Sequence, residues 1–170
     1  MCIRDSSQWV PAALQQAWRS GVSKFFWLTL RDWPRAYGLL YSQTIEGGLY
    51  FRGPTVKQDR AKPILKAFRF PLTATRKRRG IALWGRTPSS RREKVIVQYA
   101  HGGGWRKIAT FRTGSGGVFN RFVKTRLGKG NRGRLRARVV SGSAKNPGGQ
   151  VKSMAYPLKP IRDYYQPPFG

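Results

Sequence analysis

The sequence contains very little of the residue types that form covalent cross-links or metal sites. Its 170 residues include one cysteine, Cys2, and one histidine, His101. One cysteine cannot close an intrachain disulfide, and one histidine beside three glycines cannot supply the three or four ligands that zinc requires. These scarcities exclude a disulfide framework and a zinc centre built from this chain, and we expect no metal and no other cofactor.

Long apolar runs are also missing. No stretch reaches the roughly 18–20 apolar residues that span a bilayer, and no basic segment leads into an apolar run with a small-residue cleavage site. The opening letters, MCIRDS, instead resemble translated sequencing-adapter DNA at the start of an assembled reading frame. We therefore assign residues 1–7 to a non-native leader, and predict no membrane span and no signal peptide.

Acidic residues are also few. Six Asp and Glu stand against 34 Lys and Arg, which gives a formal net charge of +28 and makes a polyanionic partner such as nucleic acid an alternative to consider. In one stretch, however, arginine alternates with apolar residues such as Leu135 and Ala137, as on the solvated face of a strand. We favour that interpretation over a nucleic-acid groove, and the basic run 76–79 stays ambiguous. The alternating arginines are Arg132, Arg134, Arg136 and Arg138.

The first third of the chain has the pattern of helix, strand, long loop and helix. Residues 8–20 predict a short amphipathic helix that begins near Pro11 and stops at Gly21. Residues 24–32, KFFWLTLRD, are almost continuously apolar, which predicts a strand buried on both faces. A long loop follows, and residues 61–69 predict a second helix.

After residue 71 the pattern changes to short runs of strand-forming residues separated by Gly, Ser, Pro and Asn. This spacing of roughly ten residues is typical of a β-sandwich. The segment 101–104, HGGG, lies between two of the runs and predicts a hairpin connection, because a phosphate-binding loop would need a helix after it. The predicted strands are 81–84, 94–99, 105–112, 118–124, 135–140 and 151–156.

Three motifs in the first part carry a family resemblance. SKFFWLTLRDWP at 23–34, EGGLY at 46–50 and KPILKAFR at 62–69 resemble the last strand, loop and helix of retaining glycoside hydrolases with (β/α)8 barrels, close to the actinobacterial relatives of families 39 and 5. The strands after residue 72 resemble the immunoglobulin-like sandwich that such proteins often append. The resemblance implies a C-terminal fragment of a secreted, extracellular or cell-wall hydrolase that acts on a polysaccharide.

The fold class expected on this basis is α+β: a terminal β/α unit of a truncated TIM barrel at 8–72, an all-β immunoglobulin-like sandwich at 73–160, and a flexible tail at 161–170. Retaining glycosidases need two carboxyl groups about 5–5.5 Å apart. The resemblance places both catalytic glutamates on strands that precede residue 8, so we assign no catalytic residue here and expect the fragment to be inactive alone. Glu46 is a weak exception without a partner carboxylate.

The resemblance implies that this chain contributes one side of the sugar-binding site of the parent enzyme. Residues at the C-terminal ends of barrel strands face the active site, and a tryptophan there offers an apolar platform to a pyranose ring. The predicted substrate-binding residues are Trp27, Arg31, Asp32 and Trp33, with Tyr41 and Tyr50 as weaker candidates. The alternative function is a basic sandwich that binds nucleic acid or an acidic cell-wall polymer, with stacking aromatics Trp84, Tyr99, Trp105, Phe111 and Phe122. A third possibility is a spacer without a ligand.

Overall fold

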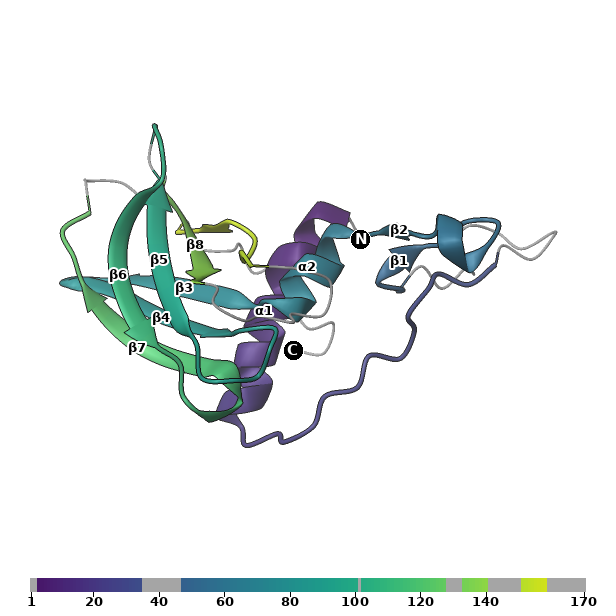
Figure 1. The fold of residues 1–170 in the computed structure, drawn as a ribbon, viewed down its shortest axis with the longest axis horizontal. Coiled ribbons are helices and arrows are strands. Elements are labelled where there is room, and N and C mark those ends of the chain that lie inside the picture. Colours follow the sequence, from purple (N-terminus) through teal and green to yellow (C-terminus); the bar gives the residue numbers. More distant parts are fainter. Residues whose placement is uncertain (1–2, 35–46, 101, 128–132, 141–150, 159–170) are drawn as a thin grey trace, which may run out of the picture. The chain divides into compact units, whose positions relative to one another are not determined.

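The computed structural model describes residues 3–34, 47–100, 102–127, 133–140 and 151–158 (Figure 1). The chain divides into two compact units, Met1–Arg69 and Phe70–Gly170, which are described separately below. The first unit contains the helices and the second contains two larger antiparallel sheets. The mixed α+β content predicted from the sequence is therefore confirmed.

The first helix, α1, spans Ile3–Arg19 and is longer than the sequence predicted. It begins inside the segment assigned to a leader, and Pro11 lies in its interior instead of its first turn. The predicted stop at Gly21 is confirmed: Gly21 has φ +78°, its amide donates to Trp18 O, and the Val22 amide donates to Ala17 O. This pair of bonds is a Schellman motif, in which glycine adopts the left-handed conformation without steric cost.

The second helix, α2, spans Pro63–Arg69, within the predicted range 61–69. Proline suits its first position because an N–H there would have no helical partner. Ile64 and Leu65 are buried against Val10 of α1 and Leu49 of the preceding loop, forming the small core of the first unit. Figure 1 shows α1 in purple and α2 in teal lying against each other.

The prediction of a doubly buried strand at 24–32 is wrong. The segment is an irregular extended chain with bends at Leu28 and Leu30, and its ladder contact among the described residues is one parallel bridge between Arg31 and Tyr50. Phe26, Leu28 and Leu30 are 84%, 92% and 64% exposed, because no strand among the described residues covers them. The described residues therefore leave most of this apolar segment uncovered.

A two-stranded ladder completes the first unit. Strand β1 (Tyr50–Phe51) pairs antiparallel with β2 (Arg60–Ala61), and a 3-10 turn (Val56–Gln58) joins them. The Leu49 and Tyr50 amides both donate to Leu30 O, and the Asp32 amide donates to Tyr50 O. The end of the extended segment is thereby held against the start of the loop that returns to α2.

The second unit is a β-sandwich of two antiparallel sheets. One sheet has the order β3-β4-β7 and the other β6-β5-β8-β9, and both contribute to a single hydrophobic core that includes Leu83, Val97 and Leu135. Figure 1 labels the strands from β3 to β8, whose colours run from teal to yellow-green. Their bounds are β3 Leu72–Lys77, β4 Gly80–Arg86, β5 Lys94–Ala100, β6 Arg106–Arg112, β7 Val118–Lys124, β8 Arg134–Val139 and β9 Tyr156–Pro157.

Most sandwich strands lie within a few residues of their predicted positions. The alternation in β8 is confirmed, since Leu135, Ala137 and Val139 are buried while Arg134 and Arg138 are exposed. The residues 102–104 connect the antiparallel pair β5 and β6, as expected of a hairpin, and His101 lies outside the described residues.

Two features of the sandwich differ from the prediction. Strand β3 was missed, because its second half begins the basic run that the sequence left ambiguous. The predicted run 151–156 is reduced to a bridge at Lys152 and the two-residue strand β9.

Candidate functional site

Arg31, a predicted sugar-binding residue, forms an ion pair with Asp59. Its Nε lies 2.6 Å from Asp59 Oδ2, and its Nη2 donates to Asp59 Oδ1 at 2.8 Å. Asp59 also accepts the Gly53 amide at 2.9 Å, and these hydrogen bonds, with that from Arg31 the larger, lower the pKa of its carboxyl below the ordinary value of 3.8. Arg31 therefore fastens the β1–β2 loop to the end of the extended segment.

Asp32 forms a second ion pair, and this one is buried. Its Oδ1 lies 2.5 Å from Lys62 Nζ and also accepts the Gly48 amide at 3.1 Å. The Lys62 ammonium lies 5.0 Å from the centre of the Phe51 ring, which adds a cation–π contact. A buried carboxylate whose Oδ1 already binds a cation and an amide acts as a positioning element, because the protein itself holds the group in place.

Trp27 is packed against α2. Its ring meets the Phe68 ring edge-on with centroids 5.6 Å apart, and its indole N–H donates to Gly47 O at 2.9 Å. Phe25 lies on the same aromatic cluster, 6.2 Å from Phe68. Trp27 thus stabilises the first unit, and its half-buried ring leaves less surface for a ligand than its position in the sequence suggested.

Trp33 has the opposite environment. It follows Asp32 directly and is 57% exposed, so its ring faces solvent next to the two ion pairs. Of the four predicted substrate-binding residues, Trp33 alone offers a large open apolar face. The structure therefore separates the four into two ion-pair residues, one packed ring and one exposed ring.

Other candidates fall outside this site or outside the described residues. Tyr50 is half-buried in β1 and packs against the core of the first unit. Glu46 and Tyr41 belong to the segment 35–46, which is not among the described residues. Within the described ranges, no group of three His, Cys, Asp or Glu side chains is placed to hold a metal ion.

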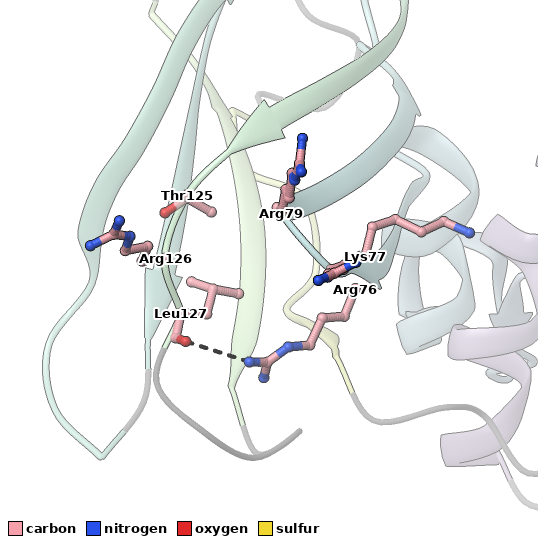
Figure 2. A pocket seen from close by; sticks show the side chains of 8 residues that line it. Arg76, Lys77, Arg79, Thr125, Arg126 and Leu127 are labelled. Atoms are coloured by element: carbon pink, nitrogen blue, oxygen red, sulfur yellow. Dashed lines mark hydrogen bonds between the residues drawn. The ribbon is translucent and has the colours of Figure 1, made fainter.

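A separate feature of the second unit is a basic hollow at the β3–β4 turn. It encloses about 400 Å³ between this turn and the segment that leaves β7 (Figure 2). The sequence drew attention to Arg76–Arg79 but gave no sign that 125–127 would lie beside them, because β7 reaches this turn only through its pairing with β4. The lining residues are Arg76, Lys77, Arg78, Arg79, Gly80, Thr125, Arg126 and Leu127.

Comparisons with known proteins give no relative from which a site could be transferred. No family model, no curated protein and no solved structure matches the chain. In the part of the chain that the structure describes, no helix is both long and apolar enough to cross a bilayer. A function for this chain is therefore inferred from its own residues.

Proposed function

We propose that residues 8–72 are the last β/α unit of a (β/α)8 barrel in a secreted glycoside hydrolase that acts on a polysaccharide. The catalytic glutamates belong to other strands of the longer protein, and residues 73–160 are an appended immunoglobulin-like domain. The proposal starts from the three motifs at 23–34, 46–50 and 62–69, which resemble the end of such barrels. Two observations of the structure support it.

The observation that carries the proposal is the open side of the extended segment 24–32. Phe26, Leu28 and Leu30 follow one another at every second residue and are all largely exposed, while Trp27 on the opposite side packs against Phe68 of α2. A strand of a parallel barrel has this arrangement, with helices on the outside and barrel interior or neighbouring strands on the other side. The open side is the surface that the remaining barrel strands would cover.

The ion pairs at the end of this segment support a binding role for the loop behind it. In barrels of this kind the loops after the strands build the active site, and their geometry must be rigid to position a substrate. Arg31 and Asp32 fix the loop through Asp59 and Lys62, and Trp33 is left exposed at the same end. We assign Trp33 the role of a sugar platform, and Arg31 and Asp32 the role of positioning residues.

The described residues do not supply the chemistry of hydrolysis by themselves. Retaining hydrolysis needs two carboxyl groups about 5–5.5 Å apart, one of them a free nucleophile. Asp32 and Asp59 are each held by a cation, and Glu93 belongs to the second unit. We therefore expect the 170-residue chain to be inactive towards glycosides.

The decisive experiment is to sequence the genomic DNA that precedes codon 7 and to express the extended protein. We expect an open frame long enough for the rest of a barrel, which typically totals about 250 residues, with two strands that end in glutamate. The extended protein should release reducing sugar from a polysaccharide, and substitution of either glutamate by glutamine should abolish this activity. An in-frame stop codon directly before codon 7 would overturn the proposal.

A further inference from the structure

The basic hollow of the second unit concentrates cations, most of which have no counter-charge among the residues that the structure describes. Five of its eight lining residues are Lys or Arg, and no carboxylate is among them. Within the described residues, the side chains of Lys77, Arg78, Arg79 and Arg126 make no hydrogen bond and no ion pair. Like charges gathered at one end of a small domain repel each other, so a bound anion would stabilise this arrangement.

No carboxylate of the second unit is placed to neutralise the hollow from within the described residues. Among the described residues of the second unit, the acidic residue is Glu93. It directly precedes β5, whereas the hollow lies at the start of β4. Strand β4 separates the two positions by about 20 Å, which is beyond the Debye length of about 8 Å at physiological ionic strength.

The backbone fixes the cations on two separate segments. Gly80 pairs with Lys124 of β7, and a Cβ at Gly80 would collide with the Val123 carbonyl, so glycine lets β7 approach the turn closely. Arg76 Nη2 donates to Leu127 O at 3.4 Å and ties β3 to the segment after β7. The spacing between the turn cations and Arg126 is therefore set by the sheet and not by mobile side chains alone.

The directions of the side chains favour an extended ligand over a small ion. Figure 2 shows Arg126 and Lys77 extending to opposite sides of the hollow, with Arg79 pointing in a third direction. A single phosphate or sulfate would be held by cations that converge on one point. Cations that spread apart suit a chain carrying successive anionic groups. The planar guanidinium groups of the arginines can each donate two parallel hydrogen bonds to a carboxylate or a phosphate.

The aromatic residues decide between two classes of polyanion. Sequence-independent binding of single-stranded nucleic acid depends on several exposed rings that stack on bases. Of the five aromatics proposed for this role, Trp84 and Tyr99 are buried, and Phe111 packs 5.3 Å from Phe119. Trp105 carries the Arg136 guanidinium 4.1 Å from its ring centre, and Phe122 remains, 49% exposed. One open ring beside a basic hollow suits a sugar chain better than a run of bases.

From these observations we propose that the hollow between the β3–β4 turn and residues 125–127 binds an anionic polysaccharide through its carboxylate or phosphate groups. The site lies wholly within residues 70–170 and is argued from the second unit alone. This proposal can therefore be tested independently of the glycoside hydrolase proposal. Its role would be to hold the protein on an acidic polymer, whichever activity the first unit serves.

The test compares two pairs of neighbouring exposed arginines in the full chain. The variant R78Q/R79Q removes two charges from the hollow, and R91Q/R92Q removes two charges from the β4–β5 connection at the other end of β4. Binding to polygalacturonate, to phosphomannan, to fully methyl-esterified polygalacturonate and to a 20-nucleotide oligothymidylate is measured at about 0.15 M salt. Circular dichroism verifies that both variants are folded.

We expect R78Q/R79Q to weaken binding to polygalacturonate by about threefold to tenfold, and R91Q/R92Q by less than about twofold, because exposed ion pairs contribute modestly but locally. Methyl esterification should abolish binding. Stronger binding to phosphomannan with the same loss in R78Q/R79Q would identify phosphate as the anion. If R78Q/R79Q does not fold, R126Q replaces it, with about a twofold loss expected.

Two results would overturn the inference. Equal losses in the two arginine pairs would mean that binding follows total charge and not this site. Tighter binding to the oligothymidylate than to either polysaccharide, with the same dependence on Arg78 and Arg79, would mean that the partner is nucleic acid.

Discussion

At the scale of single residues, Asp59 gives the first unit an acid-sensitive contact. Its pKa is lowered by the hydrogen bonds from Arg31 and the Gly53 amide, so the folded value lies below the unfolded value of about 3.8. The ion pair therefore adds stability above pH 3.8, and this contribution is lost as the pH falls through the lower folded value. In an NMR titration we expect the Gly53 amide resonance to shift with a midpoint below pH 3.8. D59N should remove the shift, and a midpoint at or above 3.8 would contradict this structure.

Asp32 and Lys62 differ from that pair because both are buried. Removing one partner leaves the other charge without compensation, which in buried pairs costs about 3–5 kcal/mol. We expect D32A to lower the free energy of unfolding of the chain by at least about 2 kcal/mol. Urea denaturation monitored by tryptophan fluorescence measures this change. The double variant D32A/K62M should recover part of this loss. A double variant less stable than D32A would show that Lys62 contributes mainly through other contacts.

The partners in these ion pairs explain why the sequence predicted the site incompletely. Arg31 and Asp32 were recognised as polar residues at the end of an apolar run, which is a local pattern. Their partners Asp59 and Lys62 lie 28 and 30 residues further along the chain, and nothing in the local sequence specifies that pairing. Trp27 and Trp33 were equivalent in sequence terms, and only the position of Phe68 in α2 distinguishes the packed ring from the exposed one.

At the scale of secondary structure elements, β8 gives the sharpest test of register. Ala137 is fully buried between the sheets, and the next residue, Arg138, is exposed. We expect A137R to unfold the sandwich, because a charge without a partner would enter the core. R138A should change the free energy of unfolding by less than about 0.5 kcal/mol, as is usual for surface positions. Thermal unfolding followed by circular dichroism measures both, and a folded A137R would disprove the register.

The same elements show which sequence patterns were informative. Strands with alternating burial, such as β5 and β8, were predicted within a residue or two because period-two alternation is encoded locally. Strand β3 escaped notice because its core residues, including Leu72 and Ala74, are followed at once by the basic run of the turn. The segment 24–32 was predicted to be a strand buried on both faces, because an apolar run does not show which strands would pair with it; among the described residues its ladder pairing is one bridge at Arg31.

At the scale of the whole molecule, the open side of the segment 24–32 predicts self-association. Three large apolar side chains lie exposed on a segment whose ladder pairing, among the described residues, is a single bridge, so a second chain can add to it. We expect L28K/L30K to reduce concentration-dependent light scattering while changing the free energy of unfolding by less than about 0.5 kcal/mol, because both side chains already contact solvent. Unchanged scattering would mean that this edge does not associate. Loss of helical circular dichroism would mean that the two leucines are part of the core.

The scarcity of carboxylates in the second unit has a consequence for its response to electrolytes. Residues 70–170 contain Glu93 and Asp163 as their acidic side chains, against a large excess of Lys and Arg. Compaction brings these cations together, so dissolved anions should favour the folded sandwich, and its melting temperature should rise between about 0.02 and 0.5 M sodium chloride. Proteins held by exposed ion pairs behave in the opposite way. The folded domain would therefore be least stable in dilute buffer and most stable at the high end of this salt range.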